Sequence, residues 1–159
     1  MKHFGLELEE KKSRLIEFGR FAQQNANRRG KKADTFTFLG FTHYSSASRN
    51  GKYRVKRKTS KKKFSKKCKE VHRLLADNRH KPVKEIIRKL NQILTGYNHY
   101  YGITDNYRSI ANFRYRMIKS LFYWLNRRSQ RKSYTWKGFQ EMLKAYPLAS
   151  PKIYVSVYD

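Results

Sequence analysis

The chain has 159 residues, which is enough for one ordinary domain or two small lobes with a modest core. Its 38 Lys and Arg residues outnumber 11 Asp and Glu residues, so the formal net charge is +27. An aromatic content of 15% excludes a disordered basic tail, because such tails lack the side chains that build a core. These values indicate a folded protein whose partner is a polyanion.

Several classes of protein are excluded by what the sequence lacks. Cys68 is the only cysteine, which excludes an internal disulfide and a multi-cysteine zinc site. No apolar run approaches the roughly 20 residues of a membrane-spanning helix, and residues 1–12 contain no signal-peptide core. We therefore expect a soluble protein of the cytoplasm, of bacterial type or in an organelle.

Alternating apolar and polar residues predict antiparallel strands in the first third of the chain. The alternation runs through residues 6–18, 35–44 and 51–58. The pair Asn50-Gly51 tolerates positive φ and predicts a hairpin loop before the last of these strands. Among the aromatic residues of this region, Phe36, Phe38 and Phe41 are expected in the core, whereas Tyr44 and Tyr53 are candidates for stacking on RNA.

After residue 58 the spacing of apolar residues becomes helical. Apolar stripes run through residues 64–75, 83–97 and 110–125, and Pro82 opens the second of them. We expect a compact three-helix bundle, followed by a short helix at residues 139–146 and an extended tail. The side chains of Tyr97, Tyr100 and Tyr101 are expected to pack in the core or at the rim of this bundle, and that of Trp124 is expected in the core.

Lysine and arginine are concentrated in two tracts that carry no acidic residue. The first, from Lys52 to Lys69, has eleven Lys or Arg among eighteen residues, and the second, from Asn106 to Gln140, has nine. A solvated helix face is the ordinary explanation of a charge run. Like charges at helical spacing repel one another, however, unless a partner neutralises them. The tracts therefore favour a protein that binds nucleic acid.

The side chains that carry chemistry form no catalytic or metal-binding pattern. The four aspartates are scattered singly, and the glutamates do not pair in a way that would hold two catalytic metals. The five histidines show no ligand spacing with one another or with Cys68, and Ser129 and Ser133 lack a nearby base. We expect no cofactor in this chain and no enzymatic activity from the chain alone.

Five motifs follow one another along almost the whole chain, from about Gly5 to Ile153. They are GLELEEKKSRL, FTFLGF, EIIRKLNQILTGYNHYY, LFYWLNRRSQRKSYTWKGF and YPLASPKI. Each motif is moderately specific, and the series in this order strongly resembles the C-terminal part of group II intron reverse transcriptase/maturases. The resemblance implies an α+β fold: palm-end strands, primer grip and hairpin over residues 1–57, a thumb-like maturase (X) helical bundle over 58–130, and a C-terminal helix and tail over 131–159.

The resemblance also implies roles for individual residues. Lys12 matches the lysine of the last palm motif, although Lys11 replaces the acid that usually precedes it. FTFLGF resembles the primer grip, in which Phe38, Leu39 and Gly40 form the turn that holds the primer terminus. With the cations of the two basic tracts and Tyr53 added, the residues predicted to contact RNA or primer are Lys12, Phe38, Leu39, Gly40, Tyr53, Arg54, Lys56, Arg57, Lys61, Lys62, Lys63, Lys66, Lys67, Arg114, Arg127, Arg128, Arg131 and Lys132.

Two functions of different classes follow from the resemblance. The first is an RNA-binding maturase module that holds structured intron RNA and template-primer backbone in splicing or reverse transcription. The second is the C-terminal half of a split RNA-directed DNA polymerase, because the family's Tyr-x-Asp-Asp turn has no counterpart in this sequence. A separate chain would then supply fingers and palm, and Mg²⁺ is implied only for that complete polymerase or for the intron RNA. The ordered motifs disfavour a generic basic nucleic-acid-binding protein.

Overall fold

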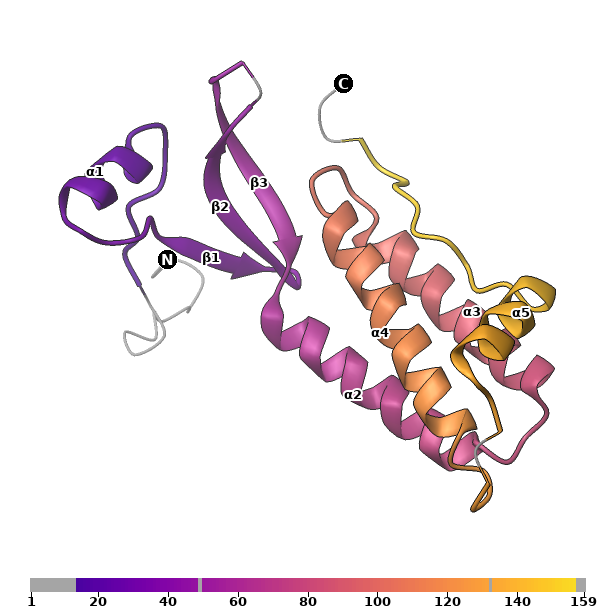
Figure 1. The fold of residues 1–159 in the computed structure, drawn as a ribbon. Coiled ribbons are helices and arrows are strands. Elements are labelled where there is room, and N and C mark those ends of the chain that lie inside the picture. Colours follow the sequence, from indigo (N-terminus) through magenta and orange to yellow (C-terminus); the bar gives the residue numbers. More distant parts are fainter. Residues whose placement is uncertain (1–13, 49, 132, 157–159) are drawn as a thin grey trace, which may run out of the picture. The chain divides into compact units, whose positions relative to one another are not determined.

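The computed structural model describes residues 14–48, 50–131 and 133–156, and these residues have an α+β fold. A three-stranded antiparallel sheet with the order β1-β2-β3 is followed by a group of helices (Figure 1). The elements are α1 (Ala22–Arg28), β1 (Thr35–Phe38), β2 (Phe41–Ala47), β3 (Tyr53–Thr59), α2 (Lys61–Asn78), α3 (Val83–Tyr101), α4 (Tyr107–Leu125) and α5 (Trp136–Ala145). The predicted fold class is confirmed.

The chain divides into two compact units. A sheet unit comprises Met1–Phe38 and Thr42–Lys56, and a helical unit comprises Leu39–Phe41 and Arg57–Asp159. The short segment Leu39–Phe41 therefore belongs to the helical unit, although the residues on either side of it belong to the sheet unit.

In the sheet unit, α1 buries two alanines that are one turn apart, Ala22 and Ala26. The guanidinium of Arg29 donates to the carboxylate of Glu17 over 2.9 Å, beside this helix. The loop that joins β2 and β3 has Gly51 at a φ of 72°, as the Asn-Gly pair predicts. The backbone N–H of Gly51 donates to the carbonyl of Ser48 over 3.1 Å, which closes that loop.

Several sequence predictions for this part of the chain were wrong. Of the strand predicted over residues 6–18, residues 14–18 belong to no strand, and the rest lies outside the described residues. Helix α1 was missed because its sequence, AQQNANR, has only small alanines on its buried face. Phe38 is 61% exposed and Phe36 is also exposed, because all four residues of β1 are open to solvent. Neither ring is a core residue.

The helical unit has a core built from the three predicted stripes. Its buried members are Val71, Leu75, Ile86, Ile87, Leu90, Leu94, Tyr97, Ile110, Phe113, Met117, Leu121, Leu125, Phe139 and Leu148. Tyr97 lies inside and stacks on Phe113 with ring centroids 3.8 Å apart, whereas Trp124 is only partly buried against this core. The prediction of an amphipathic three-helix bundle is therefore confirmed.

The C-terminal segment packs on the same bundle. Helix α5 begins three residues before its predicted start, because the hydroxyl of Thr135 caps it by accepting from the N–H of Gly138 over 3.2 Å. The tail then runs back past α3 and α4 (Figure 1). Side chains from those helices hold it: Asn98 donates to the carbonyl of Ser150 over 2.8 Å, and Arg114 donates to that of Ala149 over 3.1 Å.

A buried asparagine joins the end of β3 to the turn between α3 and α4. Asn106 is fully buried, and its amide oxygen accepts from the backbone N–H of Thr59 over 2.8 Å. Its amide nitrogen donates to the hydroxyl of Thr59 over 2.9 Å and to the carbonyl of Tyr101 over 2.8 Å. Because Thr59 and Ser60 precede α2 directly, these bonds fix the place where that helix starts.

Two further observations concern the described residues as a whole. Of the helices that the structure describes, none combines the length and the apolar character that crossing a bilayer requires. Within residues 14–48, 50–131 and 133–156, no three His, Cys, Asp or Glu side chains converge on a point where a metal ion would be held.

Candidate nucleic-acid interface

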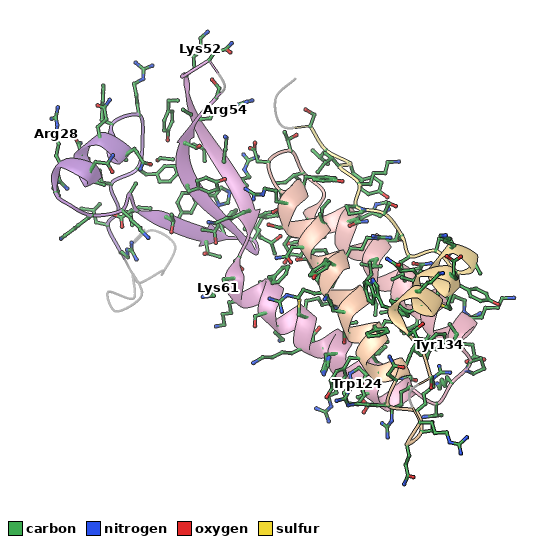
Figure 2. All side chains as sticks on the ribbon, in the orientation of Figure 1. Arg28, Lys52, Arg54, Lys61, Trp124 and Tyr134 are labelled. Carbon is green, nitrogen blue, oxygen red and sulfur yellow. The ribbon has the colours of Figure 1, made fainter. Side chains whose placement is uncertain are left out.

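The first half of α2 presents an unusually dense set of cations. Its lysines are Lys61, Lys62, Lys63, Lys66, Lys67 and Lys69. Among the described residues Lys67 alone of these forms an ion pair, with Glu70 at 3.2 Å. Figure 2 labels Lys61 in the first turn of α2. The charge of this helix is therefore not neutralised inside the described structure.

A groove of about 430 Å³ separates α2 from α3 on one side of the bundle. Its lining includes three lysines and one acid of α2 and three tyrosines of α3: Lys63, Lys66, Lys67, Glu70, Tyr97, Tyr100 and Tyr101. The carboxylate of Glu70 is paired with Lys67 over 3.2 Å. Burial raises the pKa of the Tyr97 and Tyr101 phenols further above the ordinary value, so neither hydroxyl adds negative charge to the groove. We call this feature the α2–α3 groove.

The turn between β1 and β2 lies against the tyrosines of α3. Leu39 and Gly40 have φ values of 46° and 80°, the positive pair that a two-residue hairpin turn of type I′ requires. The hydroxyl of Tyr100 donates to the carbonyl of Leu39 over 2.9 Å, and the N–H of Ser60 donates to that of Gly40 over 2.8 Å. The ring of Phe41 packs edge-on against Tyr101 with centroids 5.2 Å apart.

Leu39 is held in a conformation that is uncommon for a residue with a side chain. A positive φ costs such a residue about 1–2 kcal/mol, and its side chain is 66% exposed and so gains little from burial. Strained, exposed positions of this kind occur where the surrounding structure enforces them, often at functional sites. The hydrogen bonds to Tyr100 and Ser60 supply that enforcement.

The turn at Leu39 and Gly40 and the lysines of α2 that line the groove therefore lie beside the same two residues, Tyr100 and Tyr101. Tyr100, at 55% exposure, was not predicted as a site residue. The sequence indicated that Tyr100 is exposed. Tyr97 and Tyr101 are one helical turn apart and face the core, so Tyr100 lies outside the apolar stripe that they form. An exposed tyrosine beside a cationic helix is a candidate for contacts with sugar or phosphate.

Phe38, which was predicted in the turn, is the last residue of β1 and belongs to the sheet unit. The other predicted residues fall into three groups. Lys12 and Lys132 lie outside the described residues. Tyr53, Arg54 and Lys56 belong to the sheet unit and are half-buried on β3, where Figure 2 labels Arg54. The remaining residues, Arg57, Lys61, Lys62, Arg114, Arg127, Arg128 and Arg131, belong to the helical unit.

Three arginines of this last group already make contacts inside the unit. Arg114 holds the tail, and Arg128 donates to the carbonyl of Lys81 over 2.8 Å. The guanidinium carbon of Arg127 lies 3.5 Å from the ring centroid of Tyr123, which is a stacked cation–π arrangement. Their contribution to RNA binding stays a prediction.

Gly40→Ala is expected to destabilise the helical unit. A Cβ at Gly40 would lie 2.9 Å from the hydroxyl of Tyr101, at a φ that side chains rarely adopt. We expect the free energy of unfolding to fall by about 1–2 kcal/mol, measured by urea denaturation. Gly96→Ala is the matched control, because a Cβ there meets open space within α3, and it should stabilise by up to about 1 kcal/mol. Equal effects of the two changes would contradict a tightly packed turn.

Comparison with known proteins agrees with this geometry. Residues 61–142 match the sequence model of the group II intron, maturase-specific domain, and this range is slightly more than half of the chain. It covers α2, α3 and α4 and most of α5. Searches of curated proteins and of solved structures returned no match. The chain therefore belongs to the family of the group II intron maturase-specific domain, a module with a role in intron splicing whose partner is intron RNA.

Proposed function

We propose that this chain binds folded group II intron RNA through the lysines of α2, and that its α2–α3 groove also receives the backbone of a template-primer duplex. The observation that carries the proposal is the meeting of the Leu39–Gly40 turn with Tyr100 at one end of that groove. The family of the chain supports the choice of intron RNA as partner. Binding holds the RNA in its folded form, and the RNA itself performs the splicing chemistry.

The geometry suits recognition of a phosphate backbone. Lys63, Lys66 and Lys67 are three and four residues apart, so they project from one side of α2. A rigid helix keeps their charges at fixed spacing, while the partly buried Tyr101 beside them offers a phenol hydroxyl to phosphate or 2′-hydroxyl groups. Such contacts read the shape of a folded RNA and not its base sequence.

A steep dependence on salt is expected for this mode of binding. Each phosphate that a lysine neutralises contributes about −0.7 to −0.9 to the slope of log affinity against log salt. If five lysines of α2 take part, the slope should be about −4. Filter binding of the purified chain to folded intron RNA between low and moderate salt measures it, with an unstructured RNA of equal length as control. A flat dependence would overturn the proposed function.

The second candidate function, a split polymerase, is favoured by the turn that packs on α3, because a primer-grip turn serves a primer terminus. The chain alone should show no primer extension with template, dNTPs and Mg²⁺, since its sequence contains no Tyr-x-Asp-Asp turn. A fingers-palm fragment added in trans should restore extension if the chain is a polymerase half. Extension by the chain alone would show that a metal site had been missed.

A further inference from the structure

A second groove, between α2 and α4, lies on the opposite side of α2 from the α2–α3 groove. It has a volume of about 750 Å³, and we call it the α2–α4 groove. Phe64, Cys68 and Met117 give it apolar walls. Three small residues of its lining, Ser65, Cys68 and Ser120, leave room between the two helices.

Cations stand on both walls of this groove. Lys61, Lys69 and Arg73 come from α2, and Arg116 and Lys119 come from α4. No acidic residue is among the described residues that line it. An unpaired nucleotide has the complementary chemistry. The faces of its planar base are largely apolar and suit the apolar walls, and the phosphates on its 5′ and 3′ sides suit the cations.

One end of the groove offers hydrogen bonds and a stacking surface. Nδ1 of His72 is 2.7 Å from the hydroxyl of Ser120 and accepts from the indole N–H of Trp124 over 3.3 Å. Because an indole N–H can only donate, Nδ1 is an acceptor here, and Nε2 is the ring nitrogen that is left to donate. Tyr123, which also lines the groove, is 41% exposed, and its ring is stacked with Arg127.

The polar groups of the lining favour a nucleotide over an acidic amphipathic helix. Ser120 and Nδ1 of His72 already bond to each other, but apolar anchors of a peptide would cover Ser65 and Nε2 of His72 without offering them partners, and buried polar groups without partners are costly. The edge of a base carries donors and acceptors that those side chains can satisfy.

We propose that the α2–α4 groove binds a single unpaired nucleotide of the RNA, with its base between the two helices and its neighbouring phosphates on the cations of the walls. The inference rests on the proposed function, because it names the element of the RNA that this second surface of the helical unit recognises. With this site the chain would recognise unpaired nucleotides in bulges or loops as well as the phosphate backbone of the RNA.

Cys68 provides a direct probe of occupancy, because it is the only cysteine of the chain and lies on the wall of the groove. Burial raises the pKa of its thiol, and the nearby Arg116 offsets part of that rise. A base in the groove should cover the sulfur, so alkylation by N-ethylmaleimide should slow at least tenfold with a saturating RNA hairpin that carries a one-adenosine bulge. The same hairpin without the bulge, also at saturation, should slow the alkylation of Cys68 less than twofold.

Affinity for the two hairpins supplies the second measurement. We expect the unaltered chain to bind the bulged hairpin about tenfold more tightly than the paired one, and Ser65→Trp, which fills the groove from an exposed position, to abolish that preference. Asn112→Trp, on an exposed part of α4 outside the groove, is the matched control and should keep it. The double change Lys69→Ala and Lys119→Ala leaves the groove open and should also reduce the preference.

Equal affinities and equal alkylation rates with the two hairpins would overturn the inference. Protection of Cys68 by an acidic helical peptide, but not by the bulged hairpin, would overturn it in favour of a protein partner. Either result leaves salt-dependent binding to folded intron RNA intact, whereas failure of the proposed function removes that binding as well. The two failures are therefore distinguishable.

Discussion

Replacing Lys63, Lys66 and Lys67 with alanine should weaken binding to folded group II intron RNA about a hundredfold. The three side chains line the α2–α3 groove, and a loss of about 1 kcal/mol for each cation corresponds to a factor of roughly one hundred in all. The slope of log affinity against log salt should become shallower by about 2 to 3, because three fewer phosphates are neutralised. Filter binding at several salt concentrations measures both effects.

A matched triple change separates position from total charge. Lys84, Lys89 and Lys137 are exposed cations of α3 and α5, and none of them lines the α2–α3 groove or the α2–α4 groove. Changing them to alanine removes the same charge and should weaken binding less than fivefold. Equal losses from the two triple changes would mean that the RNA is attracted by net charge alone. Circular dichroism of both variants checks that the bundle remains folded.

The helical bundle was predictable because its helices are long and strongly periodic. Each of α2, α3 and α4 places its apolar residues three and four apart, and such a stripe has no other way to leave water than to pack against a neighbour. The ordered motifs then gave the family, which the match over residues 61–142 confirms. The same resemblance predicted a turn of Phe38, Leu39 and Gly40, of which Leu39 and Gly40 form the observed turn and Phe38 ends β1.

The sheet unit was less predictable because its signals are short and local. The period-two pattern of residues 35–44 continues across a two-residue turn, so one predicted strand is in fact the two strands β1 and β2. Helix α1 has too few large apolar residues to produce a stripe.

The two grooves also escaped prediction, since they depend on which faces of the helices meet in space. Ser65 and Ser120, for example, line the α2–α4 groove from different helices. A sequence pattern shows that each residue is small, but it does not show that both lie along the same hollow.

The role of Asn106 was equally hidden, and its replacement carries the largest expected effect on stability. Asn106→Ala removes three hydrogen bonds and leaves the N–H of Thr59 without that partner in a buried setting, whereas the carbonyl of Tyr101 still accepts from the N–H of Ile103 over 2.9 Å. An unsatisfied buried donor costs about 1–3 kcal/mol and each of the other lost bonds about 0.5–1.5 kcal/mol, so we expect the free energy of unfolding to fall by about 3 kcal/mol. Urea denaturation measures the change. Asn112→Ala, at an exposed position of the same helix, should change stability by less than about 0.5 kcal/mol.

The substitution Asn106→Asp tests which of these bonds matter. A carboxylate still accepts from the N–H of Thr59 but faces the carbonyl of Tyr101 with no proton to donate. Burial beside that carbonyl favours the neutral acid, so the pKa of the new side chain should be higher in the folded than in the unfolded chain. Stability should then be greatest below the unfolded pKa and be lost as pH rises through the folded one. A stability close to that of the unaltered chain at every pH would show that the bond to Tyr101 contributes nothing. Because Thr59 directly precedes the Ser60 cap of α2, both variants should also weaken RNA binding, even under conditions where the bundle stays folded.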